Sequence, residues 1–215
     1  MYVPATPLPA APLAPVGIAS ADPSPTVPTP VHTDLRVRGY QLNVLADHRA
    51  NVTGTLLGER RQGLPDQPVA LQELGRHGWR TLARARTGTR GRFRLSFVPR
   101  RLGSDWVRLR FAGAGPELPA HRRLGRLNVY RVAMASWYGG GGSLACGGAL
   151  TSSTMGVANK TLPCGTEITL RYDGRTVRVP VVDRGPYVAG REFDLTEATK
   201  EALGFEGVGQ VWSTS

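Results

Sequence analysis

The amino-acid sequence predicts an all-β protein in which a β-sandwich is followed by a small barrel with one short helix. Short segments of alternating apolar and polar residues recur between residues 34 and 131, and turn-type clusters separate them. From Ala133 the chain becomes glycine-rich with short apolar segments, and helical character is limited to one stretch near the C-terminus. We therefore divide the chain into a leader (1–33), a sandwich (34–131) and a barrel (132–215).

The sandwich is predicted from its alternating strands. In 92–97, the clearest of them, three apolar side chains share one face and Arg92, Arg94 and Ser96 share the other. The segment 58–69 resembles the start of bacterial Ig-like or prealbumin-like modules, which are spacers or adhesion units, and it carries no catalytic residues. The remaining predicted strands are 35–38, 41–45, 69–74, 79–85 and 106–111.

Positive charge is concentrated before the barrel. The chain has a formal net charge of +11, and residues 1–131 hold twenty basic and eight acidic residues, whereas 132–215 hold seven and eight. The arginine-rich strand face of the sandwich either confers solubility or binds anionic wall polymers. Nucleic acid is not expected as a partner, because no aromatic residue interleaves with these arginines as a stacking platform requires.

The leader is rich in proline, which blocks helix and central strand, so 1–33 is expected to be extended, solvated and disordered. Ala19-Ser20-Ala21 resembles a signal-peptidase cleavage site, but no basic segment precedes it. The leader is therefore either a signal peptide or a wall-spanning linker. The chain contains no apolar run long enough for a transmembrane helix.

The barrel segment has its own local signals. Asp173-Gly174 predicts a hairpin between strands 168–172 and 176–182. Thr196 is a suitable helix N-cap before 197–203, Gly204 suits the C-terminal end of that helix, and 208–212 is a closing strand.

Three phrases in this segment occur together in a specific order. They are Ala135-Ser136-Trp137-Tyr138-Gly139, then Asn159-Lys160-Thr161-Leu162-Pro163-Cys164-Gly165-Thr166, then Val182-Asp183-Arg184-Gly185-Pro186-Tyr187 continuing through Gly190-Arg191 to Asp194-Leu195-Thr196. Their order and spacing resemble the rare lipoprotein A family of double-psi β-barrels, over about two-fifths of the chain. The resemblance implies a secreted, cell-wall protein that binds or cuts peptidoglycan glycan strands.

Lytic members of that family use a carboxylic acid and no activated water. The acid protonates the glycosidic oxygen, and its carboxylate then assists attack of the muramic C6 hydroxyl on C1, giving a 1,6-anhydro product. Asp183 is the candidate acid, because it ends an apolar strand at a Gly-Pro turn, where partial burial could raise a carboxyl pKa. The alternative is that Asp183 only accepts backbone hydrogen bonds in its own turn.

Six further residues are candidates for substrate contact. Trp137 or Tyr138 could stack on a sugar ring, and their strand positions allow only one of them to face the groove. Asp194 is either a second acid or a brace for the helix start or for the Asp183 loop. The others are Tyr187 for the groove, and Arg184 and Lys160 for a carboxylate of the muramic unit.

One departure from the family pattern concerns the second acid. Lytic members carry Ala-Asn-Gly-Glu after the first strand, but here Ala145-Cys146 is followed by Gly147 and Gly148, so a glycine replaces the glutamate. Three functions therefore remain open: a lytic transglycosylase using Asp183, a non-catalytic glycan-binding or expansin-like wall-loosening module, and an interaction protein that acts through its basic sandwich. A second carboxylate near Asp183 would favour cleavage, and a groove plugged by the loop 139–143 would favour the third function.

Cys146 and Cys164 are expected to form a disulfide in an exported protein, and paired cysteines resemble the actinobacterial branch of the family. Two free thiols in a reducing cytosol are the alternative. All four histidines precede the barrel, so the barrel alone holds no His-dependent triad or metal site. No cofactor and no metal are expected.

Overall fold

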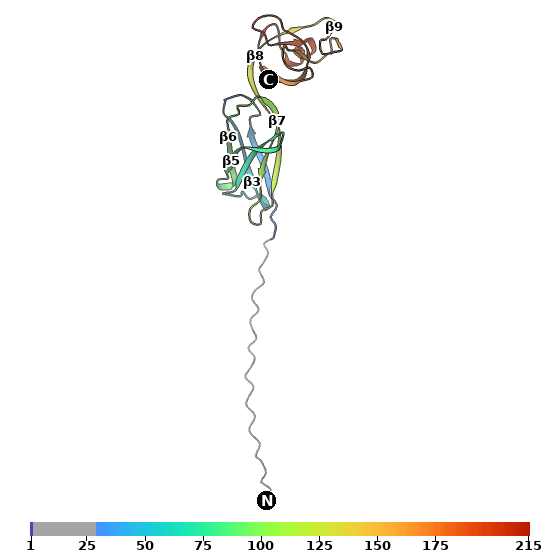
Figure 1. Cartoon of the computed structure of the whole chain (residues 1–215). Helices are drawn as coiled ribbons and strands as arrows, with labels where there is room; N and C mark the ends of the chain where they lie inside the picture. Colours follow the sequence, from blue (N-terminus) through green and yellow to red (C-terminus); the bar gives the residue numbers. More distant parts are fainter. Residues whose placement is uncertain (2–28) are drawn as a thin grey trace.

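The computed structural model describes Met1 and residues 29–215. Figure 1 shows two β-rich bodies joined end to end through β8 (Ala120–Tyr138). The leader's disorder and its Ala19-Ser20-Ala21 site fall outside the described residues, apart from its last few positions. Of these, Val31 exchanges backbone hydrogen bonds with the 116–118 segment, and the Thr33 hydroxyl donates to the Leu118 carbonyl. Ordered pairing therefore begins by Val31.

The first sheet of the N-terminal body contains β1 (Asp34–Tyr40), β3 (Ala50–Leu57) and β6 (Arg92–Phe97) in the order β1-β3-β6, with all pairs antiparallel. The predicted alternation of β6 is observed, because Phe93, Leu95 and Phe97 are buried and the residues between them are exposed. Strand β3 lies between the other two strands and was not anticipated from its sequence.

The second sheet of this body packs its apolar face toward the first. It contains β5 (Gly78–Arg86), β4 (Pro68–Gly75), β7 (Gly103–Phe111) and the N-terminal part of β8, on which β2 (Asn43–Leu45) also pairs. Both sheets contribute to one buried cluster that includes Leu56, Leu95, Leu71 and Leu109. Two 3-10 turns, η1 (Glu59–Arg61) and η2 (Thr89–Gly91), complete this body.

A closed barrel forms the C-terminal body. The C-terminal part of β8 pairs with β15 (Gly209–Ser213) on one side and with β14 (Phe193–Thr196) on the other. Between them the ring runs through β12 (Glu167–Tyr172), β13 (Arg175–Asp183) and β11 (Val157–Ala158). The pairs β8–β14 and β11–β13 are parallel, which requires crossover connections in this small barrel. A separate buried cluster fills it, including Ala135, Val181, Phe193 and Leu195.

The local signals of the barrel are largely confirmed. The hairpin turn is Asp173-Gly174, with positive φ at both residues as a two-residue hairpin turn favours. Helix α1 (Glu197–Leu203) starts after Thr196 and ends at Gly204 in the left-handed region. However, the Thr196 side chain does not cap the helix, because its hydroxyl bonds to Gly156 and Thr199 instead.

The fold class is therefore confirmed as all-β with one short helix, and it includes a closed barrel. Within residues 29–215, no helix has the length and apolar character to cross a bilayer.

Candidate functional site

Asp183 is the last residue of β13, and a β-bulge decides which way its side chain points. Val179 and Val181 are fully buried in the barrel core, so strict alternation would direct Asp183 inward as well. The register against β11 shifts instead: Val157 pairs with Val181, and the next residue, Ala158, pairs with Asp183. Val182 is thus the extra residue, and the bulge turns the carboxylate to the outer face of the barrel.

The bulge is supported by tight local packing. The Val182 carbonyl accepts a hydrogen bond from the Cys146 N–H at 3.2 Å. A Cβ at Gly156 would lie 2.4 Å from Val182 Cγ2, so only glycine leaves room for the bulged side chain. Because Gly156 also binds Thr196 and Thr199, the packing links the bulge to the start of α1.

The barrel register places the two candidate acids in one row. Ala158 pairs with Asp183 on one side and with Asp194 on the other, and Asp194 in turn pairs with Ser136 on β8. Residues directly opposite each other on neighbouring strands share a face, and two strand spacings separate the backbones of the acids by about 10 Å. Only β11 lies between the strands that carry Asp183 and Asp194, so the two acids are neighbours on the outer face.

The Asp183 carboxylate is held through one of its two oxygens. Oδ1 accepts the N–H of Arg184 at 2.8 Å and the N–H of Ala145 at 2.9 Å. The first bond lies within the acid's own turn, and the second comes from a loop 38 residues away in sequence. Oδ2 has no hydrogen-bond donor of normal geometry among the described residues, so one oxygen of this carboxylate is anchored by backbone N–H groups and the other is not.

Tyr138 completes this face. Its hydroxyl is buried, and among the described residues it has no hydrogen-bond partner of normal geometry. Burial raises the pKa of the Tyr138 phenol, and the charge of Asp183, the close approach of the phenol to that carboxylate and the charge of Asp194 raise it further, in that order. The phenol therefore remains a neutral hydrogen-bond donor beside the two carboxylates.

Asp194 belongs to a short polar chain. The Ser136 hydroxyl donates to Asp194 Oδ1, and Arg191 Nη1 donates to the same hydroxyl oxygen at 3.2 Å. Ser136 and Arg191 were not among the predicted site residues. The alternation that places Ser136 and Tyr138 on one face of β8 was a usable signal for Ser136, whereas the approach of Arg191 depends on the tertiary fold.

The disulfide is confirmed, and it joins the loops on either side of Asp183. Cys146 follows Ala145, whose N–H binds the carboxylate, and Cys164 lies in the loop after β11. Arg184 supports the same loop, because Nη1 donates to the carbonyls of Asn159 and Leu162 at 3.0 and 2.9 Å. The guanidinium of Arg184 therefore points to this loop, while its backbone N–H serves Asp183.

The other predicted contact residues lie in different surroundings. Trp137 is on the opposite side of β8 from Tyr138, and the Lys200 ammonium lies 4.5 Å from its ring centroid. Tyr187 is 81% exposed, four residues after Asp183. Lys160 is also exposed, and it follows Asn159, whose N–H donates to the Asp183 carbonyl at 3.1 Å.

Three glycines of the glycine-rich loop face open space. A Cβ added at Gly140, Gly141 or Gly142 would meet no atom within 4 Å, and the same is true of Gly148. Gly148 accepts a backbone hydrogen bond from Leu144 and has a φ of 86°. It lies three residues from Ala145, so a longer side chain at this position would extend from the loop that holds Asp183.

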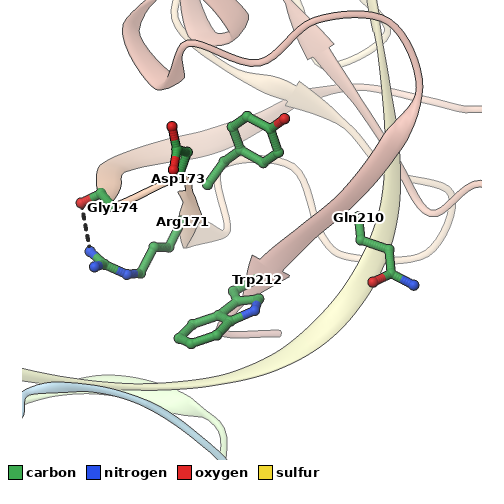
Figure 2. A pocket seen from close by; sticks show the side chains of 6 residues that line it. Arg171, Asp173, Gly174, Gln210 and Trp212 are labelled. Atoms are coloured by element: carbon green, nitrogen blue, oxygen red, sulfur yellow. Dashed lines mark hydrogen bonds between the residues drawn. The ribbon is translucent and has the colours of Figure 1, made fainter.

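A pocket of about 300 Å³ lies elsewhere on the barrel, beside the β12–β13 hairpin. Figure 2 shows Arg171 donating to the Gly174 carbonyl there, with Trp212 and Gln210 projecting from β15. No residue predicted for the site lines this pocket. Within residues 29–215, no group of three or more metal-binding side chains is clustered.

Comparison with known proteins agrees with this geometry. Residues 130–212 match a protein-family model described as lytic transglycolase, of the double-psi β-barrel type. The C-terminal body therefore resembles the double-psi β-barrel domain that this family model describes. The match covers the whole ring of the barrel and the strands that present Asp183, Asp194 and Tyr138.

Two curated relatives carry the same name. The chain is 34% identical over 123 residues to "Probable endolytic peptidoglycan transglycosylase RlpA" of Synechocystis sp., covering 49% of this chain and 38% of that protein. It is 45% identical over 75 residues to the protein of that name in Aquifex aeolicus, covering 33% of each. The chain thus spans only about a third of these relatives' length. Among solved structures, the Streptomyces papain inhibitor is 27% identical, with a TM-score of 0.33, over 39% of this chain and 90% of its own.

Proposed function

We propose that the RlpA-like domain cleaves peptidoglycan glycan strands as a lytic transglycosylase, with Asp183 as both acid and base. The observation that carries the proposal is the outward carboxylate with one anchored and one unoccupied oxygen. The name printed for the relatives, endolytic peptidoglycan transglycosylase, supports the same reaction.

The proposed reaction balances with a single carboxyl group. Protonated Asp183 Oδ2 donates its proton to the glycosidic oxygen, and the bond from that oxygen to C1 of the muramic unit breaks. The carboxylate then accepts the proton of the C6 hydroxyl as the C6 oxygen bonds to C1, which closes the 1,6-anhydro ring and regenerates the acid. No water is consumed, so the paired carboxylates of hydrolytic glycosidases are not required.

The surrounding groups have defined parts in this proposal. The N–H groups of Ala145 and Arg184 stabilise the carboxylate while it is ionised. The buried Tyr138 hydroxyl supports the Asp183 carboxylate from beside it, and Asp194 with Ser136 orients the sugar from the other end of the row. Tyr187 offers an exposed ring for stacking, and Lys160 offers a cation for a substrate carboxylate.

The proposed location is outside the cell, in the wall. A disulfide that pins a catalytic loop persists in an oxidising compartment and is rare in the cytosol. The substrate itself is extracellular, which is the second reason to place the protein there.

A non-catalytic glycan-binding module is the second candidate. Gly148 supplies no carboxylate where lytic members of the family carry glutamate, and one hydrogen bond of Asp183 lies within its own turn. In that case Asp183 organises the loops of a binding surface, and the barrel binds glycan without cutting it.

One digestion experiment separates the two candidates. Purified peptidoglycan is incubated with the whole chain and with Asp183→Asn, and 1,6-anhydromuramic products are measured by mass spectrometry, with wall pelleting as a binding assay. Asp173→Asn is the matched control, because Asp173 undergoes the same change in the hairpin turn, at a positive φ that asparagine accepts.

The proposal requires product from the wild type and from Asp173→Asn, and a loss of about a hundredfold or more in Asp183→Asn. Absence of product from all three proteins, with wall binding retained, would establish the binding module. Gly148→Glu then tests its cause: it restores the family's carboxylate at a position open to solvent, with a backbone cost of about 1 kcal/mol. Product formed only by that variant would assign the missing activity to Gly148.

A further inference from the structure

The outer face of the second sandwich sheet combines tryptophan with arginine. Register places Arg84, Arg110 and His121 in one cross-strand row and Arg108 and Arg123 in the next. It also pairs Trp106 with Arg126, and Trp79 lines the same recess as Trp106. We call this surface the Trp–Arg face; its residues are Trp79, Trp106, Arg84, Arg108, Arg110, Arg123 and Arg126. Two of its members, Arg123 and Arg126, lie beside a bulge on β8.

The two indoles are paired with guanidinium groups. Arg108 Cζ lies 4.0 Å from the Trp79 ring centroid, and Arg126 Cζ lies 4.7 Å from that of Trp106. Trp106 is still 45% exposed, and it lines a recess of about 270 Å³ together with Leu74, Trp79 and Arg123. The sequence argument that no aromatic residue interleaves with arginines concerned the arginine face of 92–97, and tryptophan does interleave with arginine on this second sheet.

The positive charge of this face is uncompensated. Within residues 29–215, none of its five arginines forms an ion pair, whereas Glu73 and Asp105 pair with Arg80 and Arg101. Partial burial and the like charges of Arg110 and Arg123 lower the pKa of Arg108. Like charges held this close repel each other, so an anionic ligand would relieve the repulsion.

We propose that the Trp–Arg face is a binding site for an acidic polysaccharide whose sugar rings carry carboxylate groups. The exposed indole of Trp106 contacts the apolar side of a sugar ring, and the guanidinium groups around the recess bind its carboxylates. Single-stranded nucleic acid, whose phosphates and bases also suit arginine and indole groups, is the competing ligand that the test distinguishes. The site is separate from the barrel and does not depend on its activity.

The test uses oligogalacturonate, which carries one carboxylate on each ring, with the whole chain and a fluorescent label for anisotropy. Three comparison ligands are used. A neutral malto-oligosaccharide of equal length has sugar rings without charge, and polyphosphate has charge without rings. A single-stranded DNA oligonucleotide represents the competing polymer. The variants are Trp106→Ala and the double change Arg110→Gln with Arg123→Gln, all at exposed positions. The charge-matched control is Arg92→Gln with Arg94→Gln on the opposite sheet.

The proposal expects oligogalacturonate to bind and the neutral oligosaccharide not to bind. The Arg110/Arg123 variant and Trp106→Ala should each weaken binding by about fivefold or more, and the control pair by less than about twofold. Equal weakening by the control pair would show that only net charge matters and would overturn the proposal. Three other results would overturn it as well. The first is polyphosphate binding as tight as that of oligogalacturonate and unaffected by Trp106→Ala. The others are tighter binding of the DNA and the absence of oligogalacturonate binding.

Discussion

Removal of the Cys146–Cys164 disulfide is expected to destabilise the barrel strongly. The bond closes a loop over a sequence separation of 18. On the chain-entropy account, a loop of that length contributes roughly 3 kcal/mol by restricting the unfolded chain. The change to make is Cys146→Ala with Cys164→Ala, since alanine leaves no thiol to form other bonds.

Loss of the disulfide should also loosen the loop that holds the Asp183 carboxylate. Cys146 donates its N–H to the bulged Val182, and its neighbour Ala145 donates to Asp183 Oδ1. The freed loop should therefore loosen around the carboxylate even where the barrel stays folded. Hydrogen exchange at Ala145 should become faster in the variant, while exchange in β6 of the sandwich should be unchanged.

The assay is denaturant unfolding of the wild type and the variant, followed by barrel and sandwich probes, with reduced wild type as the matched comparison. The free energy of unfolding of the barrel should fall by roughly 3 kcal/mol in both the variant and the reduced protein. A loss below about 1 kcal/mol, or equal losses in both bodies, would refute the reasoning that the loop constraint acts within the barrel.

Two further predictions concern packing and ionisation. Gly156→Ala should lower the unfolding free energy of the barrel by about 1–3 kcal/mol in denaturant titration, because the added Cβ would overlap Val182. The control Gly141→Ala should change it by less than about 0.5 kcal/mol, because that position faces open space. Similar values for both variants would contradict the packing account. Burial raises the pKa of Tyr130 to about 12, so the folded state holds this proton more tightly than the unfolded state, whose phenol titrates near pH 10. The stability contribution is therefore complete below about pH 10 and is lost between about pH 10 and 12, by up to roughly 3 kcal/mol. Tyr130→Phe should lack this alkaline component, and an unchanged pH dependence in that variant would refute it.

The strands and turns with strong local signals were predictable. The alternation of 92–97 and the Asp173-Gly174 turn depend on side-chain polarity and backbone preference, which act over a few residues. Strand β3 was missed although it is the centre of its sheet. Its residues alternate weakly because both neighbouring strands and the facing sheet bury much of it.

The candidate site was predictable in part. Asp183, Asp194 and Tyr138 were named from their phrases, and the structure brings all three to one face. Trp137 lies on the other side of β8 beside Lys200, as period-two alternation requires for one of the two aromatic residues. Which of them would face the acid depended on the ring closure between β8 and β14.

The sequence by itself determined the all-β class, the hairpin, the short helix and the set of polar residues from which the site is built. These follow from local polarity and turn chemistry, which any chain segment expresses without its partners. The tertiary structure alone decided the direction of the Asp183 carboxylate, the donor role of Ala145 and the gathering of tryptophan with arginine on one sheet. Each of these depends on strand register and on a bulge of one residue, and a shift of one residue reverses the face on which a side chain lies.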